Sequence, residues 1–225
     1  MPTLPEHVRS IVTEIETDIG ESTGLEDGTH SDSPETDDSV RIEHAVRDIL
    51  TEIGEDADRE GLRRTPERIH RMYHELTAGY HVDPDRLING AVFAVDYSEM
   101  VVVKGIEFYS LCEHHLLPFF GTAAVGYLPR DRVIGLSKIP RIVEMYARRL
   151  QVQERLTQEV ADFLMKTIDP HGVGVVIEAQ HLCIAMRGVR KGGATMVTSA
   201  VLGQFRRSQR TREEFLAHLE RGDNR

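Results

Sequence analysis

The chain has 225 residues, of which 40% are hydrophobic, so it can bury a core as one domain with an appendage or as two small domains. Its net charge of -10 resides in residues 1–40, which hold eleven acidic residues and one basic residue, whereas the rest of the chain holds 26 of each. A neutral body gives no sign of an extended nucleic-acid surface, and no run approaches the roughly 18 apolar residues of a membrane span.

The N-terminal segment has neither a basic stretch nor an apolar signal core, so the expected location is cytoplasmic. Residues 7–19 place apolar side chains at helical spacing, but residues 20–40 are almost free of them. Acidic segments of such low hydrophobicity rarely bury enough surface to fold. We therefore expect residues 1–40 to form an acidic, disordered tail; a docking helix for a partner or a neighbouring subunit is the less favoured alternative.

Two helices are predicted next. Residues 42–53 carry an apolar stripe that ends at Gly54, a residue typical of the position just after a helix. A second helix is predicted to begin at Thr65 as the N-cap, with Pro66 in the first helical position. We expect residues 41–90 to form a helical subdomain.

Beyond residue 90 the hydrophobic period changes, and strands and helices alternate in blocks. The predicted strands cover residues 100–106, 121–127, 173–179 and 195–201, and the predicted helices cover residues 137–150 and 153–168, with a short last helix from residue 211. Pairs of strands that flank a pair of helices predict an α+β domain with an antiparallel sheet over residues 91–225.

The two cysteines of the chain both lie next to or near histidine. Cys112 and His115 are three residues apart, so a tight turn can direct both at one metal ion, and Cys183 would complete a set of three ligands. Three protein ligands leave one tetrahedral position for water, which is typical of a catalytic zinc site and indicates hydrolysis. A disulfide, or two buried cysteines beside a core histidine, are the competing interpretations.

Several motifs, in order, closely resemble GTP cyclohydrolase I over residues 41–220. They are Leu111-Cys-Glu-His-His-Leu-Leu-Pro, Val133-Ile-Gly-Leu-Ser-Lys-Ile, Gln151-Val-Gln-Glu-Arg-Leu-Thr, His181-Leu-Cys, Met186-Arg-Gly-Val and Thr211-Arg-Glu-Glu-Phe-Leu. Pro140 departs from the family's usual pattern, but proline is tolerated in a first helical turn.

The resemblance implies the tunnelling fold, in which a four-stranded antiparallel sheet and a helix pair (ββααββ) form subunits of a toroidal homodecamer with active sites between subunits. It implies zinc-dependent hydrolysis and rearrangement of GTP to 7,8-dihydroneopterin triphosphate with release of formate, the first step of tetrahydrofolate or pterin biosynthesis. No nucleic-acid or membrane partner is expected.

The resemblance also assigns roles to single residues. Cys112, His115 and Cys183 match the zinc ligands, one ion per subunit. His114 and His181 match catalytic acid–base groups, a role that suits histidine near neutral pH, although either could instead orient a metal ligand. The remaining histidines of the body are predicted at the surface: His44, His70, His74, His81, His171 and His218.

Guanine and triphosphate need different partners. Glu154 matches the carboxylate that accepts both the N1–H and the amino group of guanine, with Gln153 adjacent as a further substrate contact. Adenine would leave this carboxylate unpaired, so such a site rejects it. The matches to triphosphate contacts are Ser137, Lys138, Arg141 and Arg187, with Arg68 as a candidate from a neighbouring subunit; the first three lie at a helix N-terminus, which itself attracts anions. Each of these charged groups could instead be an ordinary surface residue.

Two other functions compete with this one. A zinc deaminase would show His-x-Glu followed by Pro-Cys-x-x-Cys, and the chain has neither. A non-catalytic nucleotide- or pterin-binding relative of the same fold would be signalled by loss of a zinc ligand, and all three ligands are present.

Overall fold

The computed structural model describes residues 37–220, and the predicted tail up to residue 36 lies outside the described residues. The chain divides into two compact units, with the boundary between Thr77 and Ala78. The assignment of residues 41–90 to one helical subdomain stays a prediction. No helix in the described part of the chain is long and apolar enough to cross a membrane.

The first unit contains the two predicted helices, α2 (Asp37–Glu52) and α3 (Thr65–Leu76), which pack against each other. Helix α2 begins at Asp37, so its first four residues come from the segment expected to be a disordered tail, and Gly54 follows the helix with φ of +87°. Helix α3 begins at Thr65, but its N-cap is Arg64, which makes no side-chain capping bond. The prediction of Thr65 as the N-cap is therefore wrong, because this residue already lies in the first turn.

His70 is a second correction in this unit. It was predicted at the surface, but only 7% of it is exposed. Its ring lies edge-on to that of His74, with 4.5 Å between centroids, and its Nδ1 is 3.9 Å from the Glu43 carboxylate. The reason is the phase of the helix: His70 and Pro66 are four residues apart, and both are buried on one face of α3.

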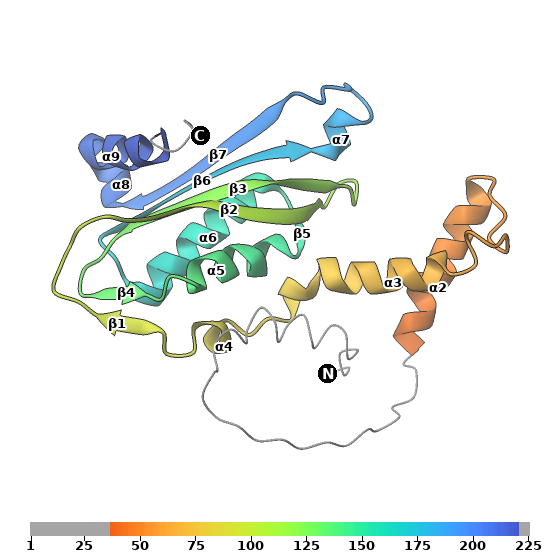
Figure 1. The fold of residues 1–225 in the computed structure, drawn as a ribbon, viewed down its shortest axis with the longest axis horizontal. Coiled ribbons are helices and arrows are strands. Elements are labelled where there is room, and N and C mark those ends of the chain that lie inside the picture. The colour runs from red at the N-terminus through yellow and green to blue at the C-terminus, as the bar shows by residue number, and fades with distance from the viewer. Residues whose placement is uncertain (1–36, 221–225) are drawn as a thin grey trace, which may run out of the picture. The chain divides into compact units, whose positions relative to one another are not determined.

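The second unit is built around a sheet with the strand order β5-β2-β3-β6-β7 (Figure 1). Its strands are β2 (Val101–Cys112), β3 (Pro118–Leu128), β5 (Leu150–Gln151), β6 (Gly172–His181) and β7 (Thr195–Gly203). A separate antiparallel pair joins β1 (Val92–Ala94) to β4 (Arg132–Ile134). The short elements η1 (Ala78–Tyr80), α4 (Pro84–Ile88) and α7 (Leu182–Ala185) occupy connections.

The four long strands pair antiparallel in the order β2-β3-β6-β7, and two-residue β5 adds a parallel edge beside Leu111 and Cys112. Helices α5 (Lys138–Ala147) and α6 (Gln153–Ile168) stand between β3 and β6 in the chain. This ββααββ order confirms the predicted α+β class and the tunnelling fold. Pro140 lies in the first turn of α5, and the helix continues past it.

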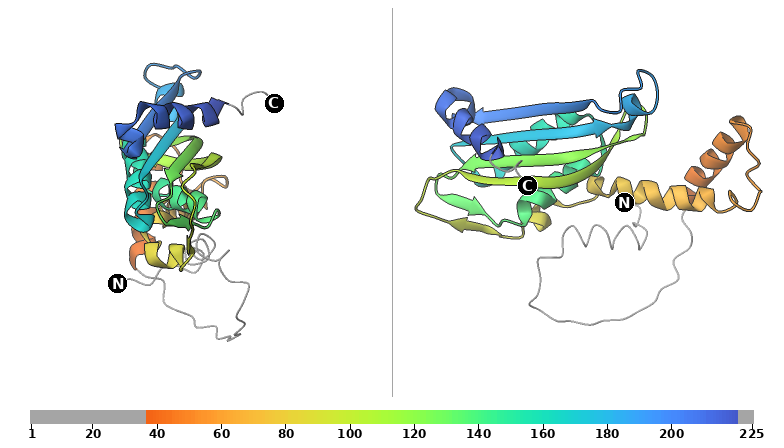
Figure 2. Two further views of the ribbon diagram at one scale, coloured as in Figure 1. Left: turned by 90° about the vertical axis from the view of Figure 1, so that its left-hand side faces the viewer. Right: turned by 45° about the horizontal axis from the view of Figure 1, so that its top comes forward.

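Both helices cover one face of the sheet, α5 against β2 and α6 against β6 and β7 (Figures 1 and 2). Helix α6 has one continuous buried stripe at helical spacing: Gln153, Leu156, Thr157, Val160, Ala161, Leu164 and Ile168. The stripe packs on alternate residues of the strands, such as Val173, Val175 and Ile177 of β6, which are fully buried. Two of the stripe's members are polar, and both lie at the N-terminal end of the helix.

The chain ends in α8 (Gln204–Arg207) and α9 (Gln209–Glu220). The rings of Phe205 and Phe215 pack edge to face, 5.4 Å apart, against Gly126 of β3 and Gly174 of β6. A Cβ at Gly126 would come within 2.7 Å of the Phe215 ring, and one at Gly174 within 2.6 Å of the Phe205 ring. Glycine at these two positions therefore lets the aromatic rings approach the sheet backbone.

Candidate active site

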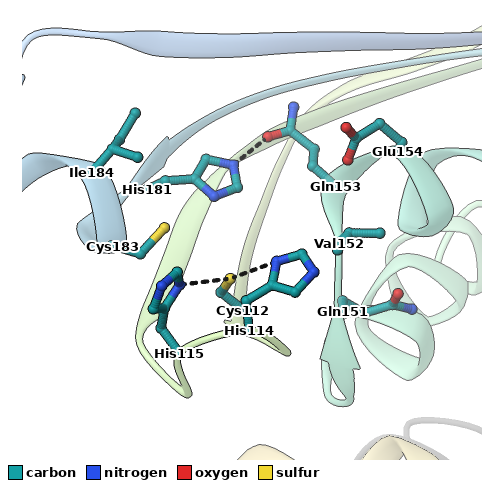
Figure 3. A pocket seen from close by; sticks show the side chains of 10 residues that line it. All are labelled: Cys112, His114, His115, Gln151, Val152, Gln153, Glu154, His181, Cys183 and Ile184. Atoms are coloured by element: carbon teal, nitrogen blue, oxygen red, sulfur yellow. Dashed lines mark hydrogen bonds between the residues drawn. The ribbon is translucent and has the colours of Figure 1, made fainter. Parts of the chain in front are cut away.

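A cavity of about 580 Å³ opens where β2, β6 and α6 come together (Figure 3). Its walls are formed by ten residues: Cys112, His114, His115, Gln151, Val152, Gln153, Glu154, His181, Cys183 and Ile184. Seven of these residues were predicted from the sequence as site residues. The seven are spread over 71 positions of the chain, from Cys112 at the end of β2 to Cys183 in α7.

The predicted metal ligands do meet. One ligand atom each from Cys112, His115 and Cys183 lies within 4.8 Å of the other two. Cys112 is buried and ends β2, and the chain then turns tightly, because the Leu116 amide donates to the Cys112 carbonyl oxygen at 2.8 Å. Leu116 reaches this turn with a left-handed φ of 55°. The turn brings the His115 Nδ1 to 4.0 Å from the Cys112 sulfur.

The donor set fits a zinc ion. Two thiol sulfurs and one imidazole nitrogen are the soft and borderline ligands that zinc prefers, and three of them leave a position open. Burial raises the pKa of the Cys183 thiol, and the neighbouring Cys112 raises it further, while Arg187 acts in the opposite direction. A dication between the two sulfurs would remove this penalty, because coordinated thiols lose their protons.

The two histidines outside the ligand set differ in environment. His114 is exposed, and its Nδ1 lies 3.9 Å from the Cys112 sulfur. The His181 ring is stacked on Phe119, with 4.6 Å between centroids and 1° between planes. Its Nε2 lies 2.8 Å from the Gln153 Oε1. Burial lowers the pKa of His181, and the charge of Glu154 acts against that shift.

The start of α6 supplies the next two residues of the pocket. Gln153 is 1% exposed and belongs to the buried stripe of the helix, whereas Glu154 is exposed and lines the cavity. The side chains of successive helical residues point in directions about 100° apart, so two neighbours in sequence contact different parts of the structure. Glu154 therefore presents a carboxylate to the cavity, and Gln153 directs its amide into the sheet.

The predicted triphosphate residues do not line this cavity. Ser137, Lys138 and Arg141 lie at the N-terminal end of α5, whereas β5, which follows the C-terminal end of the helix, pairs with Cys112. Ten residues of α-helix, or about 15 Å, separate the two ends. Arg187, just after α7, is exposed, and its charge acts to lower the pKa of Cys183. Arg68 belongs to the other compact unit.

Lys138 has an unusual environment. Only 4% of it is exposed, and its Nζ has no hydrogen-bond partner among residues 37–220. Burial lowers the pKa of Lys138 and that of Arg141. A buried ammonium group without a partner is costly, and an anion placed there would offset the cost.

Three features of the site escaped the sequence analysis. Gln151, Val152 and Ile184 line the cavity without having been singled out. Phe119 stacks on His181, and no sequence pattern connects residues on two different strands. Glu113 forms an ion pair with Arg155. The two residues belong to two of the motifs that resemble the family, but the sequence does not show that they meet.

The comparisons with known proteins agree with this geometry. A family model described as GTP cyclohydrolase I matches residues 42–220. The chain is 56% identical to "GTP cyclohydrolase 1" of Synechococcus sp. (strain JA-3-3Ab) over 80% of this chain and 79% of that protein. It is 52% identical to the protein of the same name from Leptospira biflexa, over 81% of this chain and all of that one.

A third protein of that name, from Methylococcus capsulatus, is 56% identical over 78% of this chain and 95% of its own length. Among solved structures, the archaeosine synthase QueF-Like in the apo form matches 48% of this chain with a TM-score of 0.41 and 18% identity. The family model covers the first unit from residue 42 and the second unit up to residue 220. The chain therefore belongs to the GTP cyclohydrolase I family.

Proposed function

We propose that the cavity between β2, β6 and α6 converts GTP and water to 7,8-dihydroneopterin triphosphate and formate, with one zinc ion held by Cys112, His115 and Cys183. The observation that carries the proposal is the convergence of this three-ligand cluster with two histidines and one carboxylate in a single cavity. The product is the first intermediate of tetrahydrofolate or pterin biosynthesis.

Opening the imidazole ring of guanine requires water to attack C8 and a proton to be placed on N7. Zinc in a site of this kind supplies an activated water near neutral pH. His114 and His181 are the acid–base groups that move protons between the ring, the ribose and water, since both line the cavity and neither is a ligand. Phe119 holds the imidazole of His181 in a fixed plane.

Glu154 is the guanine-recognition residue. Its carboxylate accepts hydrogen bonds from N1–H and from the 2-amino group, which no other common purine offers together. Support comes from its place in the cavity wall in the first turn of α6. Adenine would leave the carboxylate without partners, at a large loss of affinity.

The triphosphate is held by Ser137, Lys138, Arg141 and Arg187, with Arg68 as a further contact. An anion would stabilise the buried Nζ of Lys138, which has no hydrogen-bond partner among the described residues. The N-terminus of α5 adds its own partial positive charge. Because this end of α5 is about 15 Å from the end that adjoins the pocket, we infer that the α5 N-terminus of one subunit serves the cavity of another.

Assembly into a ring fits the strand edges. Within the described chain, β7 pairs only with β6, and β2 has a partner on its outer side only at Leu111 and Cys112. Two long open edges in one sheet are suited to pairing with further copies, and repeating one head-to-tail contact closes a ring. A toroidal decamer is the assembly that we propose.

The alternative of a non-catalytic relative has less support, because the ligand set and both histidines remain. The deciding experiment is incubation of the purified protein with GTP, followed by assays for formate and for the fluorescence of neopterin after oxidation. We expect both products, and we expect His114→Ala to retain zinc and GTP binding while turnover is lost. A wild-type protein that binds GTP but releases no formate would support the non-catalytic alternative.

A further inference from the structure

The amide of Gln153 has its direction fixed by the sheet beneath it. Its Nε2 lies 3.0 Å from the carbonyl oxygen of Ile177 and 2.9 Å from that of Met196. Carbonyl oxygens only accept hydrogen bonds, so the atom that faces them must be the amino group. The other end of the amide, Oε1, therefore faces His181, and the usual ambiguity between the two ends of a glutamine is absent.

A cycle of hydroxyl groups reinforces this direction. The Thr157 hydroxyl donates to the main-chain carbonyl oxygen of Gln153 at 2.7 Å, so its only proton is used there. The hydroxyl of Thr198, 2.7 Å from that of Thr157, must then be the donor between the two. Having given its proton to Thr157, Thr198 can only accept from the Gln153 Nε2, at 3.1 Å, so the two hydrogens of Nε2 are shared among this hydroxyl and the two carbonyl oxygens. Each hydrogen bond of the cycle thus has one permitted direction.

The consequence reaches the imidazole. The Gln153 Oε1 can only accept, so the His181 Nε2, at 2.8 Å, must carry a hydrogen. Neutral His181 is therefore the Nε2–H tautomer, and its lone pair is on Nδ1. Figure 3 shows Nδ1 on the side of the ring away from Gln153, toward the group of cysteine and histidine side chains.

We propose that Gln153 is a positioning residue that holds His181 in the Nε2–H tautomer and so presents the Nδ1 lone pair to the cavity; the proposal rests on the proposed function. Because Nε2 keeps its hydrogen on the Gln153 Oε1, Nδ1 is the ring nitrogen that meets substrate or water. This role differs from the substrate contact expected from sequence, because both ends of the Gln153 side chain are already engaged within the protein.

The first test is the tautomer itself. Solid-state NMR of the zinc-loaded, [15N]histidine-labelled protein at a pH of about 8, where a typical imidazole is neutral, distinguishes the two forms, and subtraction of the His181→Gln spectrum assigns the signal. We expect the Nε2–H form in the wild type and a mixture in Gln153→Met. A dominant Nδ1–H form in the wild type would overturn the proposal without any variant of Gln153.

The second test separates positioning from substrate contact. Gln153→Met should lower kcat by about 10- to 100-fold, the usual loss when the partner of a functional histidine is removed, with KM for GTP and zinc content within about twofold of wild type. Gln158→Met, the same change on the exposed face of the same helix, should leave both constants unchanged. A raised KM with normal kcat would return Gln153 to the substrate-binding role and refute the proposal.

A third pair of variants covers the case in which Gln153→Met does not fold. Thr198→Ser keeps the hydroxyl that accepts from Gln153 and should keep the tautomer and kcat, whereas Thr198→Val removes it and should lower kcat with unchanged KM. Equal kcat in these two variants, with the wild-type tautomer in both, counts against the proposal. A wild-type protein without turnover contradicts the proposed function instead, and the tautomer measurement still stands.

Discussion

Arg155 ties the two walls of the cavity together through Glu113. Its Nη2 donates to the Glu113 carboxylate and to the Leu150 carbonyl oxygen at 3.0 Å. Glu113 stands between Cys112 and His114 in the turn after β2, whereas Arg155 follows Glu154 in α6. One guanidinium therefore sets the position of the turn relative to the helix, although neither member of the pair lines the cavity.

Replacing this guanidinium should loosen the turn. We expect Arg155→Met to weaken zinc binding by about tenfold, as is usual when a support of the ligands is lost, and to lower turnover. Zinc affinity can be measured by competition with a chromogenic chelator. Arg130→Met, which removes an exposed ion pair with Asp169 at 3.7 Å beyond the other end of β3, should not change the affinity. Equal affinities in the two variants would show that the Glu113 pair has no such role.

The ligand assignment predicts the metal content. The wild-type protein should contain about one zinc per subunit, and Cys183→Ser should contain almost none, because an alcohol is a much poorer zinc ligand than a thiolate. His114→Ala, a change in the same cavity that removes no ligand, is the matched control and should keep its zinc. Elemental analysis after gel filtration gives the ratios. Full zinc content in Cys183→Ser would remove this residue from the ligand set.

Guanine recognition by Glu154 predicts a loss of affinity without loss of the metal. Glu154→Ala removes two charge-assisted hydrogen bonds, so GTP binding should weaken on the order of 100-fold. Glu154→Gln can still accept one hydrogen bond, so its affinity for GTP should lie between that of the wild type and that of Glu154→Ala. Calorimetry with GTP, and with ATP as the competing base, measures both affinity and selectivity. Unchanged GTP affinity in Glu154→Ala would place the guanine elsewhere.

Lys138→Met should separate function from stability. Loss of the ammonium group should raise KM for GTP by about 10- to 100-fold. The folded protein should nevertheless become more stable by about 1 kcal/mol, because a buried charge without a partner is removed. A lower melting temperature in Lys138→Met would contradict this account of the buried ammonium.

The same residue predicts a pH dependence. Burial lowers the pKa of Lys138 below its ordinary value of 10.5. Between the lowered and the ordinary pKa the unfolded chain binds more protons than the folded chain, so wild-type stability gains a contribution as pH rises through that interval. Lys138→Met lacks this contribution. Melting curves of both proteins across alkaline pH should therefore converge as pH rises.

A site shared between subunits predicts complementation. His114→Ala disables the cavity, and Lys138→Met disables the α5 N-terminus. At a GTP concentration well below the raised KM of Lys138→Met, neither variant has appreciable turnover. When the two proteins are unfolded together and reassembled at equal amounts, random mixing gives about one quarter of the sites a wild-type cavity and a wild-type α5. Turnover should then reappear in the mixture. A mixture as inactive as its components would place each complete site within a single chain.

The sequence predicted the long periodic elements best. Helix α6 spans Gln153–Ile168, the residues predicted, because its apolar stripe recurs over more than four turns. The short strands β1 and β5 were not predicted, since two or three residues carry no readable period. Their pairing depends on contacts elsewhere in the fold; β5, for example, is defined by its partners Leu111 and Cys112.

Seven of the predicted site residues line the cavity, but the sequence did not show how their side chains are connected. The sequence predicted Gln153 only as a substrate contact, whereas the structure places it with Thr157 on the buried side of α6. Its actual partners, Ile177 and Met196, lie 24 and 43 positions away on separate strands. No local pattern indicates which carbonyl groups two strands will present to a helix, so this part of the site required the fold.

The polar end of the α6 stripe has a consequence for protein engineering. The buried Thr157 and the half-buried Thr198 are natural targets in a search for thermostable variants, where hydrophobic residues of similar size often replace polar groups inside the fold. At these positions such a gain in melting temperature would come with a loss of turnover. Screens for heat resistance alone would therefore select against catalysis in this layer, and stabilising changes are better sought in the outward-facing residues of the helices.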